Sequence, residues 1–360
     1  YVRVEKVLKT LTSIEADFFY IGCRRGSHSK RSVQPMRNVT HNVANFAIPH
    51  GGLRSGLYTL RFLCYAVYKV VIIRPDMVIA VNEEIALPFV TFFPRTTVIC
   101  EAYDSLSMRA PNTSKLLSRV LKMVSRFVLS KCDALVEVSP ERLEAHRSKP
   151  PEVRVVPNSL SKENYPDDNR ICEELQRTVC NRQYIFVSGS FSDEINGLEE
   201  LLEAVERLDG KLTIIAAGRP NGKWVSTVFV RHHLVKYVGV VTPAEAIYIT
   251  SKSKGIFAYY KPISELYKYA APNKIFDAMA VGVPIIMNNE CVASQFAVDR
   301  GFGLTGAYAD IALLSRNLRI VSDGACQFDS VESVRSFNTT YEWSVTSGEY
   351  KKLVQLCLRK

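Results

Sequence analysis

The sequence predicts an α/β protein with two domains, each built on a doubly wound parallel sheet. Short apolar runs alternate with segments of helical periodicity along the chain, which is typical of such sheets. A chain of 360 residues with 47% hydrophobic residues can also bury two cores. A polar stretch at 158–182 without periodicity predicts a linker. We therefore expect an N-terminal domain at 1–165 and a C-terminal domain at 166–338, followed by a closing segment at 339–360.

The first domain opens on a helix, since Val4, Val7, Leu8 and Leu11 recur at helical spacing. Strands and helices then alternate up to the linker. The apolar runs predict strands at 17–22, 42–48, 77–81, 97–100, 134–138 and 153–156. The periodic segments predict helices at 2–11, 57–73 and 114–130, and a further helix after the Ser139-Pro140-Glu141 cap.

The second domain repeats the alternation. Its apolar runs predict strands at 184–187, 212–217, 255–259 and 283–287. We expect helices at 197–208, after Pro243, in the stretch 272–284, and up to Leu358, with a polar tail between 304 and 340. Gly189-Ser190, Gly218-Arg219 and Gly239 follow strands, at the sheet edge where parallel sheets bind ligands.

Positive charge is concentrated in the first half of the chain. Residues 1–160 hold 23 Lys and Arg against 13 Asp and Glu, a net +10, whereas residues 161–360 hold 23 of each. A basic half-molecule can face an anionic membrane surface, a phosphorylated acceptor or nucleic acid. We exclude nucleic acid as a partner, because no basic cluster alternates with aromatic residues and no known motif appears.

The sequence gives three indications about the compartment. No apolar run is long enough to span a bilayer, and no secretory signal is visible. The nine dispersed cysteines, without a Cys-x-x-Cys pair, fit reduced thiols in a cytoplasm. The helix at 57–73, which carries Arg61 and Lys69, fits either an interfacial membrane helix or a helix that covers a sheet. We expect a cytoplasmic protein, peripheral on the inner face of the cell membrane.

The stretch 272–284, PNKIFDAMAVGVP, carries the strongest functional signal. Asn273 can cap a helix there, and Gly282 stands where a helix end favours positive φ. A helix start that carries Lys274 suits a diphosphate, and Asp277, on the same face, could accept hydrogen bonds from a ribose. The same spacing also fits a solvated ion pair on a packing helix.

This stretch resembles the donor-site signature of family 4 (group 1) glycosyltransferases of the GT-B superfamily, with about ten positions agreeing in order. The run from Glu101-x-x-Asp104 through CDALVEVSPE to VVPNS is similar to the same family, as is the closing Tyr341-Glu342-Trp343-Ser344. The resemblance implies two Rossmann-like domains facing a cleft, with 339–360 returning to the first. It also implies that the strand which would precede residue 1 is missing.

The resemblance implies a hexosyltransferase that moves a sugar from a nucleotide diphosphate to a hydroxyl of a polysaccharide or lipid-linked acceptor, with retention of configuration. The expected catalytic residues are Lys274, Asp277 and Glu101. Glu101 follows a strand at the sheet edge that binds ligands, with capping of the next connection as the alternative. The expected donor-binding residues are Gly189, Ser190, Arg219, Gly239, Asn273, Lys274 and Asp277. We expect no cofactor and no metal, since no Asp-x-Asp motif or histidine ligand spacing occurs.

The sequence departs from the family pattern at two places. Many members carry two glutamates near this stretch; the second aligns with Asp277, but the first falls at Tyr269, with Glu265 too early in the chain. Many also carry an Arg and a Lys where this chain has Ser190 or Phe191 and Asn196. Two alternatives stay open: a non-catalytic nucleotide-sugar-binding subunit, motivated by Tyr269 in the glutamate position, and a sugar-nucleotide epimerase, which shares the fold and needs no acceptor.

Overall fold

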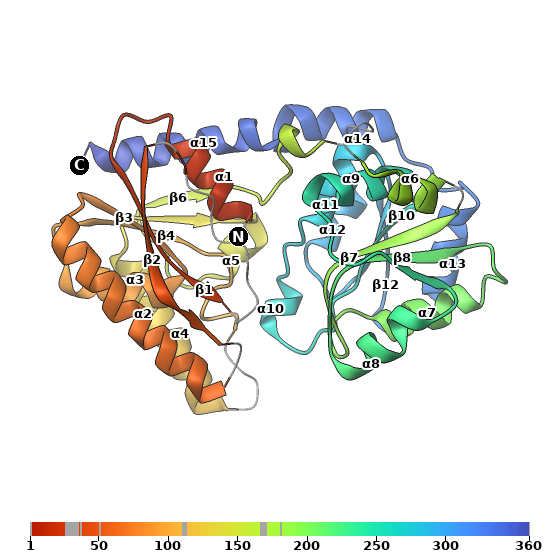
Figure 1. Ribbon diagram of the computed structural model, residues 1–360, viewed down its shortest axis with the longest axis horizontal. Coiled ribbons are helices and arrows are strands. Elements are labelled where there is room, and N and C mark those ends of the chain that lie inside the picture. The colour runs from red at the N-terminus through yellow and green to blue at the C-terminus, as the bar shows by residue number, and fades with distance from the viewer. Residues whose placement is uncertain are drawn as a thin grey trace. The chain divides into compact units, whose positions relative to one another are not determined.

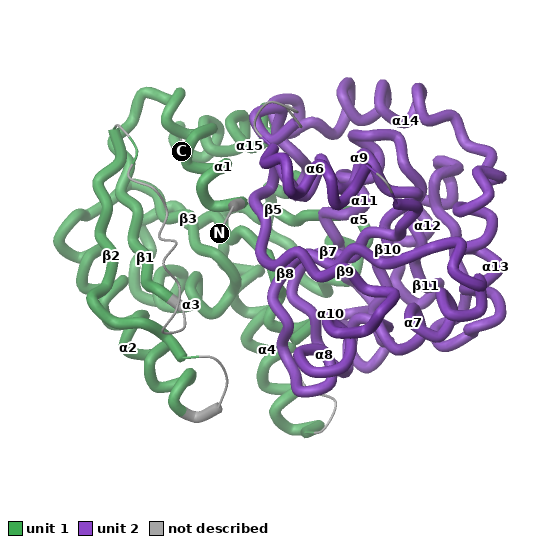
Figure 2. The backbone as a smooth tube through the Cα atoms, turned by 45° about the vertical axis from the view of Figure 1, so that its right-hand side comes forward, with its two compact units in different colours: residues 1–157, 347–360 green, residues 158–346 purple. Residues whose placement is uncertain are grey.

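The computed structural model describes residues 2–25, 36, 38–49, 52–109, 114–165, 171–180 and 182–359. It divides into two compact units, residues 1–157 with 347–360 and residues 158–346 (Figure 2). The chain passes between the units twice, at 157/158 and at 346/347. The expected linker residues 166–170 lie outside the described residues, and 171–180 belong to the second unit.

Unit 1 alternates helices and parallel strands (Figure 1). Its strands are β1 Phe18–Arg25, β2 Val39–Ile48, β3 Met77–Val81, β4 Thr97–Glu101, β5 Ala134–Glu137 and β6 Glu152–Val155. Its helices are α1 Val2–Leu11, α2 Gly52–Ile73, α3 Glu83–Phe92, α4 Lys115–Lys131, α5 Pro140–Ala145 and the end of α15 Trp343–Leu358.

The strands of unit 1 form two parallel sheets. β3, β4, β5 and β6 pair in that order, and β1 and β2 pair separately. One core lies between the four-stranded sheet and three helices, to which α2 contributes Ala66 and Val70, α3 contributes Phe89, and α4 contributes Val128 and Leu129. Since these helices share one core, they form a single layer against the sheet.

Two elements of unit 1 differ from the sequence predictions. The sequence gives no indication of α3, whose residues EEIALPFVTF include Pro88, and proline normally argues against a helix interior. Fully buried Glu83 anchors the start of α3 by accepting hydrogen bonds from the hydroxyls of Ser105 and Ser125, at 2.6 and 2.8 Å. Helix α2 begins at Gly52, five residues before the expected start at Leu57.

The expectation that no segment could span a bilayer is wrong for α2. Residues Arg54–Ile73 are apolar and long enough to cross a membrane by length and composition, because Arg61 and Lys69 are too few to lower the mean hydropathy below the range of membrane helices. Phe62, Ala66 and Val70 of this helix are nevertheless buried, so one side of α2 is held by protein.

Unit 2 contains a sheet of six parallel strands in the order β12-β11-β10-β7-β8-β9 (Figure 1). Its strands are β7 Tyr184–Ser192, β8 Thr213–Asn221, β9 Val235–Tyr237, β10 Gly255–Ala258, β11 Ile285–Asn288 and β12 Gly303–Gly306. Its helices are α6 Glu173–Cys180, α7 Leu198–Glu206, α8 Lys223–Thr227, α9 Pro243–Lys252, α10 Glu265–Lys268, α11 Lys274–Val281, α12 Ser294–Asp299, α13 Ile311–Ser322, α14 Ser330–Ser336 and the start of α15.

Both faces of the unit 2 sheet are buried. Along β7, Ile185 and Val187 pack into one core with α7 and α13, and Tyr184 and Phe186 pack into another with α6 and α9. This alternation is the doubly wound arrangement that the sequence predicts. The expected polar tail at 304–340 is wrong, since α13 and α14 lie there; buried Leu318 and the Asp310 cap place α13 on the sheet.

Candidate functional site

Three glycines lie toward the carboxyl ends of strands in the unit 2 sheet: Gly189, Gly218 and Gly239. We call this group the glycine edge. Gly189 and Gly218 are paired in register on β7 and β8, and the Gly218 amide donates a 2.7 Å hydrogen bond to the carbonyl of Gly239. Their φ angles are +116°, +148° and +78°, which L side chains rarely adopt. A Cβ on Gly218 would lie 1.7 Å from the carbonyl oxygen of Gly189. This edge is therefore bare backbone that a ligand can approach closely.

Helix α11 starts opposite these glycines and ends as the sequence predicts. Gly282 adopts φ +68° and ψ +42°, and the Val283 amide closes the helix on the carbonyl of Ala278 at 3.1 Å. The expected Asn273 cap is wrong: Asn273 already has helical backbone angles, and its side chain makes no capping hydrogen bond. A capping residue needs an extended backbone, whereas this turn begins with the Ile275 amide bonded to Pro272.

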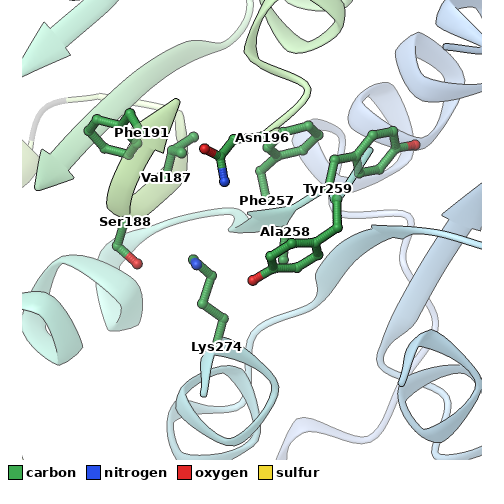
Figure 3. A pocket seen from close by; sticks show the side chains of 9 residues that line it. Val187, Ser188, Phe191, Asn196, Phe257, Ala258, Tyr259 and Lys274 are labelled. Carbon is green, nitrogen blue, oxygen red and sulfur yellow. The ribbon is translucent and has the colours of Figure 1, made fainter. Parts of the chain in front are cut away.

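The side chain of Lys274, the first residue of α11, approaches the glycine edge. Its Nζ lies 3.7 Å from the position of a Cβ built on Gly189. Its side chain extends from the helix toward Ser188 and Asn196 (Figure 3). The pocket around it is lined by Val187, Ser188, Phe191, Asn196, Phe257, Ala258, Tyr259, Tyr260 and Lys274. An ammonium group, a helix start and a glycine edge thus meet at the carboxyl ends of β7 and β10.

A buried amide fixes the far wall of the pocket. Asn288 is fully buried; its Oδ1 accepts from the amide of Tyr260 at 2.8 Å, and its Nδ2 donates to the carbonyl of Tyr260 at 3.0 Å. The same Nδ2 donates to Glu290 at 2.8 Å. Burial opposes ionisation of Glu290, but hydrogen bonds from Asn288 and the Tyr308 amide outweigh it and lower the pKa of this carboxyl. These bonds hold the chain rigidly where it leaves β10.

Tyr259 closes the pocket on its apolar side. Its ring stacks on Phe257 with centroids 4.6 Å apart, and Gly197 packs against it, since a Cβ there would lie 2.9 Å from the Tyr259 Cβ. Burial, together with the charge of Glu290, raises the pKa of the Tyr259 phenol. Its hydroxyl has no hydrogen-bond partner among the described residues.

The structure brings most of the predicted donor residues together. Gly189, Ser190, Arg219 and Gly239 lie on the glycine edge; Ser190 and Arg219 are paired in register, and both are exposed. Asn273 is exposed beside Lys274 at the start of α11. Asp277 lies one turn further along α11 and is half-buried; among the described residues, the pocket lining includes Lys274 but not Asp277.

Several lining residues escaped the sequence predictions. Ser188, Tyr259 and Tyr260 belong to or directly follow strands that the sequence predicts, but nothing in the sequence shows that they face a common pocket. Asn196 is a pocket residue that could have been predicted from the sequence, because it stands where the family pattern has a basic residue. Its Oδ1 accepts from the Ser192 amide at 2.8 Å and holds the loop before α7.

Glu101 lies in unit 1, within a buried polar cluster. Its carboxylate accepts from Arg3 Nε at 2.9 Å and from the Tyr350 hydroxyl at 3.2 Å, and it is only 2% exposed. Arg3 also donates to the carbonyl of Val156 at 2.9 Å. Burial and the charge of Glu101 raise the pKa of Tyr350. This arrangement favours a structural role for Glu101, which joins residues far apart in the chain.

Replacing Glu101 by glutamine is expected to lower the free energy of unfolding by about 2 kcal/mol, because Arg3 loses its charged partner while it stays buried. Urea unfolding measures this change. The matched control, Glu173→Gln, removes an exposed helix pair with Arg177 and is expected to cost about 0.5 kcal/mol or less. Unchanged stability with lost enzymatic turnover would instead support the acceptor-side role expected from the sequence.

The described part of the chain contains no group of three or more His, Cys, Asp and Glu side chains that could hold a metal ion. All nine cysteines are free. Two positively charged side chains lie at the glycine edge: Lys274 and, on the neighbouring strand, Arg219.

No family model and no curated protein sequence matches the chain, but several solved structures are similar to it. Sucrose-phosphate synthase from Thermosynechococcus elongatus has a TM-score of 0.79 at 13% identity, covering 99% of this chain and 93% of that chain. WaaG, a glycosyltransferase involved in lipopolysaccharide biosynthesis, has a TM-score of 0.69 at 11% identity, covering 96% and 93%. HepE from Anabaena, in complex with UDP and glucose, has a TM-score of 0.64 at 12% identity, covering 88% and 86%.

These neighbours are GT-B enzymes, so the chain has the GT-B fold. The predicted fold class, with two Rossmann-like parallel-sheet units, is thereby confirmed. At these identities the likeness concerns the fold, and any activity has to be argued from the site itself.

Proposed function

We propose that this chain is a glycosyltransferase that moves a sugar from a nucleoside-diphosphate donor to a hydroxyl of a polysaccharide or lipid-linked glycan. The observation that carries the proposal is the position of Lys274 Nζ, 3.7 Å from a Cβ built on Gly189, at the start of α11. A diphosphate is the ligand that such a site suits, because close backbone approach, the positive end of a helix dipole and an ammonium group all favour it.

The chemistry requires stabilisation of the leaving group. The acceptor oxygen bonds to the anomeric carbon while the bond from that carbon to the diphosphate oxygen breaks, and the diphosphate leaves with the electron pair. Negative charge grows on the diphosphate as the sugar acquires oxocarbenium character. Fixed positive groups at that position lower the barrier most. In this proposal Lys274 and the positive end of the α11 helix dipole supply them, the reaction retains configuration, and no metal has a role.

Two further residues outside the pocket lining suit the donor around this diphosphate. Asp277 follows Lys274 on α11 at the spacing that suits a ribose hydroxyl. Exposed Arg219 at the glycine edge can pair with a phosphate oxygen. The structural neighbour HepE was solved with UDP and glucose, which supports a nucleotide sugar as the ligand of this fold.

A second candidate is a nucleotide-sugar-binding subunit without catalytic activity. Two observations favour it: Tyr269 stands where many family members have a glutamate, and Glu101 is engaged in a buried ion pair with Arg3. In this case the donor binds in the same pocket, but the sugar is not transferred.

A thermal-shift panel of nucleoside diphosphates and their sugar conjugates tests both candidates. We expect one base to raise Tm, with nucleoside diphosphates shifting it more than the matching monophosphates, because Lys274 and α11 contact the second phosphate. Release of free nucleoside diphosphate from the stabilising conjugate then separates the transferase from the binding subunit. If no nucleotide stabilises the protein, both candidates are wrong.

A further inference from the structure

Helix α4 carries an apolar stripe on its solvent side. Leu116, Val120, Met123 and Phe127 recur at spacings of four, three and four residues, so they share one face. All four are exposed, Leu116 by 74% and Met123 by 64%. The buried side chains of α4, including Val128 and Leu129, occupy the opposite face. The stripe is therefore additional to the core face of this helix.

Helix α2 repeats the pattern. Leu57, Leu60, Tyr68 and Val71 are exposed and lie on one face. Leu57 is exposed by 67%, and the opposite face carries the buried Phe62, Ala66 and Val70. Two helices that share one core thus each present an apolar stripe to solvent. Scattered single apolar side chains would need no explanation.

Both helices carry basic residues and no acidic one. Helix α2 contains Arg54, Arg61 and Lys69, and α4 contains Lys115, Arg119, Lys122, Arg126 and Lys131. On α4 the basic residues at 115, 119, 122 and 126 follow one flank of the stripe, because they share a helical face next to it. An apolar stripe flanked by positive charge is complementary to lipid chains bordered by anionic headgroups.

The two stripes belong to one layer of unit 1. Helices α2, α3 and α4 bury their inner faces in a single core, and α2 and α4 begin at the same end of the unit in both views (Figures 1 and 2). Phe92, at the end of α3, is 73% exposed. The outer surface of this layer therefore extends over more than one helix.

We propose that the outer surface of α2 and α4, with their exposed stripes and basic residues, is a docking surface for an anionic lipid bilayer. The helices lie in the plane of the headgroups, since the inner side of each is held by the core. The occupant follows from charge complementarity: eight basic residues on two helices without a carboxylate disfavour a second copy of the same surface, which would oppose like charges.

Sedimentation with lipid vesicles, without any nucleotide, tests the proposal independently of donor binding. We expect the protein to bind vesicles of phosphatidylcholine with phosphatidylglycerol, to bind phosphatidylcholine alone weakly, and to dissociate as salt is raised. Met123→Glu with Phe127→Glu is expected to lower partitioning about tenfold or more, because two side chains no longer enter the apolar layer. Arg119→Gln with Arg126→Gln is expected to lower it about tenfold on anionic vesicles only.

The matched control adds the same two charges on exposed apolar residues of unit 2. Val331→Glu with Val345→Glu, at side chains 76% and 46% exposed, is expected to leave vesicle binding within about twofold, the small change that two remote charges cause. Equal loss in this control, or no binding by the unaltered protein, overturns the proposal. So does a dimer in analytical ultracentrifugation that Met123→Glu with Phe127→Glu converts to monomer, because the surface would then bind another copy.

Discussion

Replacing Lys274 by alanine is expected to reduce turnover of the nucleotide-sugar donor by about 10²- to 10³-fold, the effect of removing one group that stabilises developing charge. Its Nζ faces the glycine edge of β7, where the proposed diphosphate lies. Only the positive end of the α11 helix dipole and Arg219 would then stabilise the charge that forms as the diphosphate departs. Steady-state kinetics with the donor selected by the thermal-shift panel measures the loss.

The comparison with Lys211→Ala makes the result specific. Lys211 is an exposed lysine in the turn before β8, and its removal is expected to leave turnover and Tm unchanged. If Lys274→Ala weakens donor binding in a protein that shows no turnover, the binding-subunit candidate stands. Unchanged donor affinity and unchanged turnover in Lys274→Ala would falsify the site for both candidates.

Replacing Gly218 by valine is expected to destabilise unit 2 by about 4 kcal/mol or more, which places it among the most severe single substitutions. The first added carbon would lie 1.7 Å from the Gly189 carbonyl oxygen, and the backbone there has φ +148°. Because the obstacle is backbone in a neighbouring paired strand, no rotamer change relieves it. Urea unfolding and the yield of folded protein measure the effect.

Two other glycines serve as controls for Gly218→Val. Gly348 lies inside α15 with nothing within 4 Å of an added Cβ, so Gly348→Ala is expected to stabilise by about 0.5–1 kcal/mol. Gly210 has φ +77° and equally open space, so Gly210→Ala isolates the backbone cost of about 1–2 kcal/mol. A loss for Gly218→Val no greater than that for Gly210→Ala would show that β7 and β8 can separate without penalty.

The local features of the site could be predicted from the sequence. The order of residues in 272–284 predicts a helix followed by a buried strand, and Gly282 ends that helix with positive φ as expected. Alternation of apolar runs predicts the parallel sheet and hence the edge on which Gly189 and Gly218 lie. Each of these inferences depends on residues within one or two elements.

The features that escaped prediction depend on contacts between distant residues. Glu101 ends a strand, as a ligand residue of a parallel sheet would, but its partners Arg3 and Tyr350 stand 98 and 249 positions away. The Asn273 cap failed because helical geometry begins one residue earlier than the side-chain pattern indicates. The exposed stripe on α4 has the spacing of a core face, and only the packing of Val128 and Leu129 shows which face is inside.

The return of the chain to unit 1 through α15 has a consequence for synthesis on the ribosome. Unit 2 is one uninterrupted segment, 158–346, whereas unit 1 combines 1–157 with 347–360. The fully buried Tyr350 and Leu353 of unit 1 emerge only after all of unit 2 has been translated. Unit 2 can therefore complete its core first. Residues 1–157 of unit 1 are made earlier but lack residues 347–360 until synthesis ends, and until then they are accessible to chaperones.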